Sequence, residues 1–259
     1  MDHPAHARAL NSDVPIERFG ALAALSGFQH AFIGRVPGIE VTHDKAEALR
    51  RLDHVHRDAR AHLGIAGLPS ITAEQVHGHE IAVVDRPVET DHRFPGCDGL
   101  ITNQSNVTLG IYVADCGAVY IVDPVRRAIG LVHSGKKGTE QGIAGQAIEL
   151  MRERFGSVAS DLVVQLGPCI RPPHYEIDFA AEILRQCRAL GVKEVHDAGT
   201  CTACEPARYY SYRAEKGRTG RMLALLAMTS EAPRREPLLC QTALTEPQQR
   251  YSSRSPACR

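Results

Sequence analysis

The spacing of apolar residues along the chain predicts several helices and strands. A stripe at helical spacing over residues 44–63 predicts an amphipathic helix, which Asp44 caps and Gly64 ends. Further helices are expected over 139–155, 178–190 and 222–228. Short runs rich in β-branched residues predict strands at 80–84, 100–102, 107–113, 119–122, 128–132 and 162–166. Strands cluster before helices instead of alternating with them, which favours an α+β fold over a doubly wound parallel sheet.

The domain organisation is predicted from the length and the local composition of the chain. A chain of 259 residues is long enough to bury a large core, and no internal repeat is evident. From Thr229 onward the sequence is rich in Pro, Arg, Ser and Gln without apolar periodicity. We therefore expect a loose segment over 1–24, one domain over 25–228 and a flexible tail over 229–259.

Charge and hydropathy exclude some classes of partner. Lys plus Arg and Asp plus Glu are 30 each, so the balance of charge does not indicate a nucleic acid or an anionic membrane. The N-terminal twenty residues lack the basic and apolar regions of a secretory signal. No apolar run is long enough to span a bilayer. These features predict a cytoplasmic protein without a membrane partner, in which most of the 8 cysteines are buried and reduced.

Three side chains form a candidate metal site. His77, Cys116 and His133 each lie where a predicted strand begins or ends, a position at which a side chain is both rigid and accessible. Imidazole nitrogen and thiolate sulfur are ligands that zinc prefers, and three of them leave a fourth position for water or substrate. The same Cys116 and His133 could instead form a nucleophile and its base.

Other patterns offer weaker alternatives. The two His-x-His pairs, His54 with His56 and His77 with His79, are of the kind that copper oxidases use. The first pair falls on a predicted helix, where residues two apart point to different faces. A Cys-x-x-Cys at 201–204 lacks the second knuckle of a zinc ribbon and is interpreted as structural or incidental. Phosphate-binding glycine loops and the Gly-x-Ser-x-Gly elbow are absent.

Several segments together resemble one known family. They are EQVHG at 74–78, CDGLIT at 97–102, VADC at 113–116, HSGKKGT at 133–139, LGPCI at 166–170, YEI at 175–177, CT at 201–202, SYR at 211–213 and TGR at 219–221. In this order they are similar to the polyphenol oxidase or laccase-domain family, whose members are also described as purine nucleoside phosphorylases or peptidoglycan editing factors. The resemblance covers roughly residues 28–228.

The resemblance implies an α+β fold with a layered mixed β-sheet core and flanking helices. It also implies a metal, zinc with copper as an alternative, on His77, Cys116 and His133. The activities it implies are phosphorolysis of adenosine, inosine and methylthioadenosine, adenosine deamination, and copper-dependent oxidation of phenols. Purine nucleoside and phosphate would then be the partners of a monomer or small homo-oligomer.

One motif departs from the family pattern. The family's HAGWRG reads HSGKKG here, so Lys136 replaces a tryptophan and Lys137 replaces an arginine. An aromatic wall beside the metal is therefore expected to be missing. Lys137 keeps the positive charge of arginine without its two-pronged hydrogen bonding.

Roles for the remaining residues follow from the implied chemistry. Phosphorolysis needs cations for phosphate, for which the candidates are Arg35, Lys137, Arg213 and Arg221. Asp98 and Asp115 are candidates to move a proton or to orient a ligating histidine, and Cys116 is counted among the catalytic residues. Three alternatives remain open at this point: a cysteine-dependent hydrolase or peptidoglycan editor using Cys116, a copper-dependent polyphenol oxidase, and an inactive zinc-binding relative.

Overall fold

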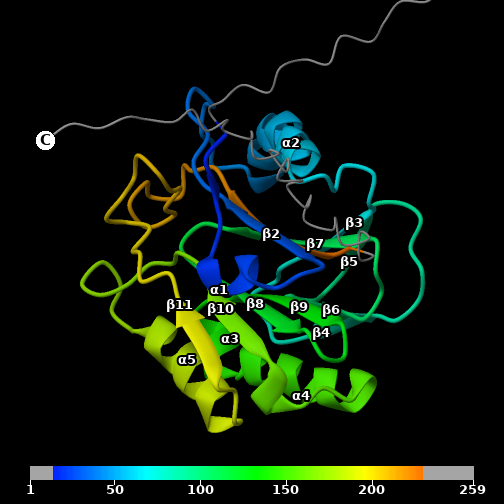
Figure 1. Cartoon of the computed structure of the whole chain (residues 1–259). Helices are drawn as coiled ribbons and strands as arrows, with labels where there is room; N and C mark the ends of the chain where they lie inside the picture. The colour runs from blue at the N-terminus through cyan, green and yellow to red at the C-terminus, as the bar shows by residue number, and fades with distance from the viewer. Residues whose placement is uncertain (1–13, 230–259) are drawn as a thin grey trace, which may run out of the picture.

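Two six-stranded sheets pack face to face in the computed structural model, which describes residues 14–229 (Figure 1). The first sheet has the order β1 (Ile16–Glu17), β2 (Phe28–Ile33), β12 (Met222–Met228), β7 (Val107–Val113), β3 (Ser70–Ala73) and β5 (His92–Phe94). The second has the order β11 (Glu194–Asp197), β10 (Val163–Leu166), β8 (Gly117–Asp123), β9 (Ala128–Ser134), β6 (Gly99–Thr102) and β4 (Ile81–Val84). Both sheets mix parallel and antiparallel pairs, so the predicted layered α+β fold is confirmed.

Helices cover the outer faces of both sheets. The long helix α2 (Lys45–His62) lies on the first sheet, and α3 (Lys136–Glu140), α4 (Ile143–Phe155) and α5 (Phe179–Ala189) lie on the second (Figure 1). The short helix α1 (Gly20–Ala23) and a 3-10 turn, η1 (Ala159–Asp161), complete the set. Within residues 14–229, none of these helices combines the length and the apolar character that crossing a membrane requires.

The main core lies between the sheets. Phe32, Ile111 and Ala224 of the first sheet share one buried cluster with Tyr120 and Leu131 of the second. The Tyr120 hydroxyl spans the layers by donating a hydrogen bond of 2.8 Å to the carbonyl of Ala31. Burying these side chains provides most of the driving force for stacking the sheets. The stacking places β7 of the first sheet against β8 and β9 of the second.

The helix predicted over 222–228 is wrong, because this segment is the strand β12. β12 pairs with β2 on one side and β7 on the other, and all seven of its residues are buried. A strand covered on both faces shows no alternation of apolar and polar residues. Its Leu, Ala and Met residues favour a helix by intrinsic propensity, and tertiary pairing overrides that preference.

Other boundaries differ from the expectation in smaller ways. The predicted helix over 139–155 is two helices, since Gly142 has a left-handed φ of 72° between α3 and α4. The segment expected to be loose contains β1 and α1, whose Leu22 is buried in the core. The tail expected from residue 229 lies, apart from Thr229 itself, outside the described residues.

Two buried histidines make the free energy of unfolding depend on pH. Burial is the main cause that lowers the pKa of His30 and of His56 to about 4. The Nε2 atom of His30 accepts a hydrogen bond of 2.8 Å from the backbone N–H of Phe19, which the neutral ring allows. Because the ordinary histidine pKa of 6.5 applies only to the unfolded chain, that state alone takes up these protons between pH 6.5 and pH 4. The contribution of these two neutral histidines to the free energy of unfolding is therefore fully present above pH 6.5 and is lost as the pH falls toward 4.

We expect His56→Phe to remove about half of this acid sensitivity. Urea unfolding at pH 7.5 and at pH 5 should show that the wild type loses roughly 2 kcal/mol more than the variant over that interval. His62→Phe is the matched control, because His62 is exposed on the same helix and is not a cause of the His56 shift. An identical loss in wild type and His56→Phe would contradict the assignment.

Candidate metal centre

Three ligand side chains meet where the two sheets join. His77 lies in the segment between β3 and β4, Cys116 in the turn from β7 of the first sheet to β8 of the second, and His133 in β9. One ligand atom from each lies within 4.8 Å of the other two. The rings of His77 and His133 are nearly perpendicular, with centroids 5.0 Å apart. The structure thus brings together the three residues that the sequence analysis chose.

The sheet register explains how two of the ligands become neighbours. β8 and β9 are antiparallel, with Ala118 opposite His133 and Gly117 opposite Ser134. Cys116 therefore emerges beside the end of β9, against Gly135. A β-carbon on Gly135 would lie 2.6 Å from the Cys116 sulfur, so only glycine leaves room for the thiolate at this place.

Asp98 orients two of the ligands through hydrogen bonds. Its buried carboxylate accepts hydrogen bonds from the His133 Nδ1 at 2.8 Å and from the backbone N–H of His77 at 2.9 Å. It also accepts from the backbone N–H groups of Val76 and Gly78. Since Nδ1 of His133 is engaged, Nε2 is the nitrogen left to bind a metal. Asp98 itself is not part of the pocket lining, and its contacts with His133 and the backbone of 76–78 are those of a positioning residue.

The electrostatics of the site favour a deprotonated sulfur. Burial opposes ionisation of the Cys116 thiol, but the charge of His133 and hydrogen bonds from His133 and His77 lower its pKa to about 6. Burial opposes protonation of His133 as well, yet the Cys116 thiolate and Asp98 raise its pKa to about 9. Both shifts favour a thiolate beside an imidazolium when no metal is bound. A metal ion would replace the imidazolium proton and find the sulfur already ionised.

The donor set fits a zinc ion. Tetrahedral zinc with two nitrogens and one sulfur places these atoms roughly 3.3–3.6 Å apart, and here they all lie within 4.8 Å of one another. His133 is buried and Cys116 is half-buried, whereas His77 is exposed. The ion would therefore be open to solvent or substrate on the His77 side, which is typical of catalytic sites. The same donors also suit copper.

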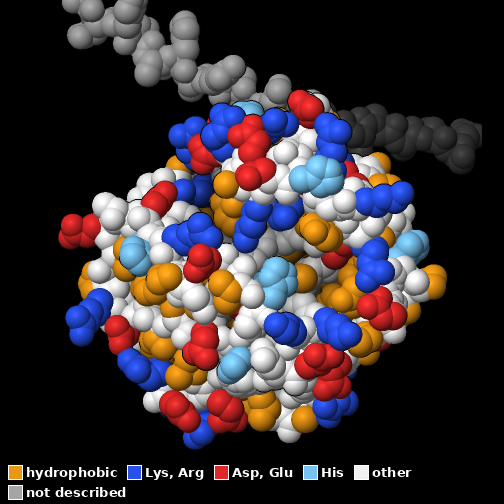
Figure 2. Space-filling view, turned by 180° about the vertical axis from the view of Figure 1, so that it is seen from behind, with side chains coloured by type: hydrophobic (Ala, Val, Ile, Leu, Met, Phe, Trp, Pro, Cys, Tyr) orange, Lys and Arg blue, Asp and Glu red, His pale blue; other side chains and the backbone are white. Residues whose placement is uncertain are grey.

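A pocket of about 640 Å³ opens onto the three ligands, a size typical of small-molecule sites. Around His77, Cys116 and His133, its lining comprises Lys45, Gln75, Tyr112, Ala114, Asp115, Lys136, Lys137, Ile170, Tyr175, Phe179, Tyr212, Arg213 and Arg221. In Figure 2 basic side chains and a histidine lie beside a hollow in the middle of one face. Five cationic side chains and a single carboxylate, Asp115, line the pocket, so it favours an anionic ligand.

Three of the four predicted phosphate-binding residues belong to this lining. They are Lys137, Arg213 and Arg221. Arg213 lies over the Tyr175 ring and pairs with Glu176 at 3.0 Å. The fourth, Arg35, lies outside the lining, because its guanidinium pairs with Glu215 at 2.7 Å and covers the Tyr210 ring.

Comparison with known proteins assigns the chain to a family. Residues 39–183 and 177–229 match the family described as multi-copper polyphenol oxidoreductase laccase. The chain belongs to this family. Purine nucleoside phosphorylase YlmD of Geobacillus stearothermophilus is 32% identical over 199 residues, which cover 62% of this chain and 73% of that relative. Purine nucleoside phosphorylase YlmD of Bacillus subtilis is 29% identical over 197 residues, covering 61% and 70%.

Solved structures of the laccase family share the fold. The crystal structure of YlmD from Geobacillus stearothermophilus superimposes with a TM-score of 0.68 at 25% identity, covering 84% of this chain and all of that one. A Bacillus licheniformis protein, YfiH, superimposes with a TM-score of 0.69 at 21% identity, covering 83% and 99%.

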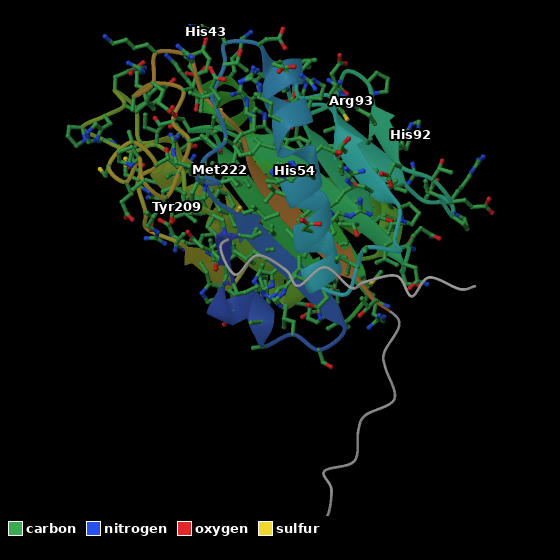
Figure 3. All side chains as sticks on the ribbon, turned by 90° about the horizontal axis from the view of Figure 1, so that it is seen from above. His43, His54, His92, Arg93, Tyr209 and Met222 are labelled. Carbon is green, nitrogen blue, oxygen red and sulfur yellow. The ribbon has the colours of Figure 1, made fainter. Side chains whose placement is uncertain are left out.

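The His-x-His pairs do not form a multi-copper cluster, despite the laccase family's description. His54 points outward from α2 (Figure 3), and His56 packs against the Tyr112 ring at 5.7 Å. His79 contacts Gln141 at 3.2 Å instead of joining His77. Within residues 14–229, neither His54, His56 nor His79 belongs to a group that could bind a metal.

Aromatic side chains line the pocket although the family's tryptophan is absent. The expectation of a missing aromatic wall concerned the position that Lys136 takes, and Lys136 does line the pocket. Tyr112, Tyr175, Phe179 and Tyr212 come from four different segments and line it together, which no single motif could reveal. Flat apolar surfaces of this kind suit a purine base.

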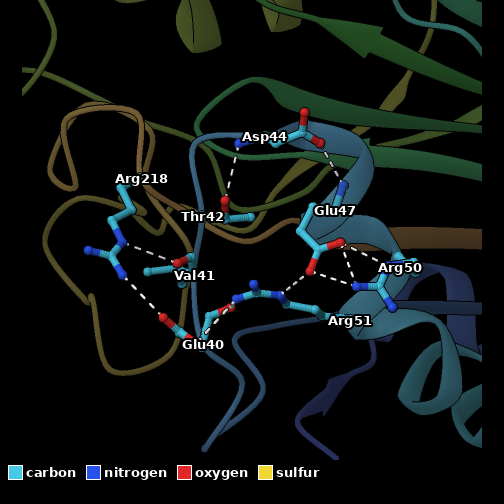
Figure 4. Close-up of polar contacts among 8 residues, drawn as sticks. All are labelled: Glu40, Val41, Thr42, Asp44, Glu47, Arg50, Arg51 and Arg218. Atoms are coloured by element: carbon cyan, nitrogen blue, oxygen red, sulfur yellow. Dashed lines mark hydrogen bonds and ion pairs between the residues drawn. The ribbon is translucent and has the colours of Figure 1, made fainter.

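Lys45 is a functional candidate that the sequence analysis missed, because its role depends on where α2 begins. Asp44 caps the helix by accepting a hydrogen bond from the backbone N–H of Glu47. Arg218 binds Glu40 and the carbonyl of Val41, which ties this end of the helix to the segment before β12 (Figure 4). Lys45 consequently faces the pocket, where burial, Arg221 and Arg93 lower its pKa.

Asp115 joins three segments of the pocket wall. Its carboxylate accepts hydrogen bonds of 2.7 Å from the Thr202 hydroxyl and from the backbone N–H of Arg213. Its carbonyl accepts from the backbone N–H of Ile170 at 2.8 Å. These contacts hold the turn that presents Cys116. In this role Asp115 positions the Cys116 turn, whereas the sequence analysis expected Asp115 to move a proton or to orient a ligating histidine.

Proposed function

We propose that the protein is a zinc-dependent purine nucleoside phosphorylase that acts on adenosine, inosine or methylthioadenosine. The observation that supports this proposal best is the convergence of His77, Cys116 and His133 on a cationic, aromatic-lined pocket. Relatives named purine nucleoside phosphorylase agree with it. A pocket with both flat apolar surfaces and positive charge suits a ligand pair of purine nucleoside and phosphate.

The metal would be held by His77, Cys116 and His133, with Asp98 fixing the tautomer of His133. When bound, zinc supplies Lewis acidity toward an oxygen of water or substrate. The protein's own residues then bind and orient the reactants. Tyr175 and Tyr212 offer faces for the base, and Lys137, Arg213 and Arg221 offer positive charge for phosphate.

The proposed reaction exchanges one bond for another at the ribose. A phosphate oxygen forms a bond to C1′ as the bond from C1′ to the purine nitrogen breaks. The bond electrons leave with the purine, which takes up a proton from water or from dihydrogen phosphate. The products are the free base and ribose 1-phosphate, or 5-methylthioribose 1-phosphate when methylthioadenosine is the substrate. Cationic side chains hold phosphate beside C1′ in the orientation of attack, which accounts for much of the rate enhancement in such reactions.

A direct assay tests the proposal. Purified protein of known zinc content is mixed with inosine, adenosine or methylthioadenosine, with and without phosphate. Release of hypoxanthine or adenine that requires phosphate is the expected result, together with equimolar ribose 1-phosphate, or 5-methylthioribose 1-phosphate from methylthioadenosine. Base release without phosphate would indicate a hydrolase, ammonia release would indicate deamination, and absence of all three from zinc-loaded protein would leave a zinc-binding relative without this activity.

The phosphate-binding role of Arg221 gives a narrower prediction. Arg221→Met should raise the KM for phosphate about tenfold or more, since a charge-assisted hydrogen bond contributes roughly 1.5–3 kcal/mol. The KM for nucleoside should change much less. Arg126→Met is the matched control, because Arg126 is exposed in the turn between β8 and β9, outside the pocket. Equal changes in both KM values would argue against a phosphate contact.

A cysteine nucleophile is the rival use of the same residues. The thiolate of Cys116 beside His133 has the arrangement that such enzymes need. Alkylation separates the two cases: zinc should protect a ligating Cys116 from iodoacetamide, and a chelator should restore its reactivity. Alkylation at the same rate with and without bound zinc would favour the nucleophile.

A further inference from the structure

A second group of metal-binding side chains lies outside the pocket. Nδ1 of His174 is 3.4 Å from the Cys204 sulfur and 4.0 Å from the Cys201 sulfur. One ligand atom from each of the three residues lies within 4.8 Å of the other two. Both cysteines are free thiols. We propose that His174, Cys201 and Cys204 form a second metal site that binds a thiophilic divalent cation, with zinc as its ion.

Two turns build this site from distant parts of the chain. Residues 201–204 form a turn in which the backbone N–H of Cys204 donates to the carbonyl of Cys201 at 3.2 Å. The Cys-x-x-Cys spacing therefore places both sulfurs on the same side of one turn, as in a zinc knuckle. The second turn brings His174, whose backbone N–H donates to the carbonyl of Arg171 at 2.9 Å. A parallel bridge between Cys169 and Cys201 holds the turns beside each other.

The chemistry of the donors selects the ion. Two thiolates and one imidazole are soft and borderline ligands, which favour zinc over magnesium or calcium. His174 and Cys204 are exposed and Cys201 is half-buried, so an ion can enter from solvent. Three protein ligands leave the fourth position to water. Since neither sulfur lines the pocket, the site is separate from the candidate metal centre.

The position of the second site suggests what the ion does. Tyr175, which lines the pocket, follows His174 directly. Thr202, between the two cysteines, donates its hydroxyl hydrogen to Asp115 beside Cys116. An ion shared by His174, Cys201 and Cys204 would lock these two turns together. It would thereby stabilise the pocket wall without touching a reactant.

Metal content tests the second site independently of the proposed function. Full-length protein is loaded with zinc under reducing conditions, freed of excess metal and measured by elemental analysis. We expect about two zinc ions per chain in the wild type and about one in Cys204→Ser, His174→Ala or Cys116→Ser. The double variant Cys116→Ser/Cys204→Ser should retain none. His196→Ala is the matched control, because His196 is a half-buried histidine of β11 that belongs to neither group.

Three outcomes would overturn the second site. They are a single zinc ion in the wild type that Cys204→Ser retains, two ions in Cys204→Ser, and a disulfide between Cys201 and Cys204 that persists under the reducing loading conditions and excludes zinc. A thermal readout covers variants that fold poorly: saturating zinc should raise the Tm of Cys116→Ser by about 5 °C or more and leave the Tm of the double variant unchanged. Equal shifts in both would also refute the site. Loss of phosphorylase activity alone bears only on the proposed function.

Discussion

Cys116→Ala is expected to abolish metal binding at the candidate metal centre and to lower phosphorolysis by roughly a thousandfold or more. The variant removes the sulfur that His77 and His133 face and leaves two imidazoles with no third ligand. Two neutral nitrogens bind zinc far more weakly than a set that includes a thiolate, because the thiolate supplies the only negative charge among the ligands. The expected loss corresponds to the several kcal/mol of transition-state stabilisation that a Lewis acid provides.

The measurement pairs zinc content with turnover. Zinc bound at the second group must be subtracted, so the assay uses the Cys204→Ser background as well as the wild type. Cys187→Ala is the matched control: Cys187 is a free, fully buried thiol on α5 that lies outside the pocket lining. It should keep both metal and activity. A Cys116→Ala protein that still binds zinc at this centre, or that retains activity near the wild-type level, would refute the ligand assignment.

Motifs in the sequence identified the three ligand residues, but local patterns could not predict that these residues lie close together in space. His77 and Cys116 are 39 positions apart, and no periodicity links them. They meet because the chain crosses from the first sheet to the second between β7 and β8. That crossing depends on strand pairings far apart along the chain. Local patterns carry no direct information about such pairings. The prediction that the three residues share one metal ion therefore depended on the resemblance to a family.

Elements with a clear amphipathic pattern or a run of β-branched residues were predicted well, and elements with neither were not. α2 begins and ends within one residue of its expected bounds, since it has a polar face, a capping Asp44 and a stop at Gly64. β7, β8 and β9 are buried almost throughout, yet their Val and Ile residues indicated strands. β12 was taken for a helix because it has no β-branched residue and its burial on both faces removes the alternation that marks a strand. The same limit applies to β2, which is buried almost continuously and has Ile33 as its only β-branched residue.

The pocket lining contains residues that no sequence pattern marked as functional. Lys45, Tyr112 and Tyr212 come from separate segments, and each looks like an ordinary helix, strand or loop residue in sequence. The second metal-binding group shows the same effect, since Cys201 and Cys204 gain their meaning only when His174 is brought beside them. Site residues that lack a motif are found only from the tertiary structure.

Asp98→Asn should weaken zinc binding at the candidate metal centre by roughly 10- to 100-fold, as loss of a partner behind a ligating histidine typically does. The Asp98 carboxylate accepts four hydrogen bonds, from His133 and from three successive backbone N–H groups. Asparagine has one acceptor oxygen and an NH₂ group that would face some of these donors. His133 would then be free to turn, and its Nε2 would no longer be directed at the ion.

The same substitution should also cost the fold roughly 2–4 kcal/mol, because buried donors lose their partner. Burial alone would raise the pKa of Asp98, but the hydrogen bonds from His133 and the backbone hold it below its ordinary value. A lowered folded-state pKa means that this stabilisation is complete above the unfolded value and is lost as the pH falls through the folded one. The loss caused by Asp98→Asn should therefore be largest at neutral pH and shrink in acid.

Asp123→Asn separates the effect on zinc affinity from the effect on the free energy of unfolding. Asp123 is a fully buried carboxylate at the opposite end of β8, and it accepts hydrogen bonds from the backbone N–H groups of Val125 and Arg126. Its substitution should lower the free energy of unfolding and leave zinc affinity at the centre unchanged, as measured by competition with a chelator in the Cys204→Ser background. If Asp98→Asn and Asp123→Asn weaken zinc binding equally, Asp98 acts through general stability and not by aiming His133. If only Asp98→Asn weakens it, the hydrogen bond at Nδ1 sets the direction of the metal-binding nitrogen.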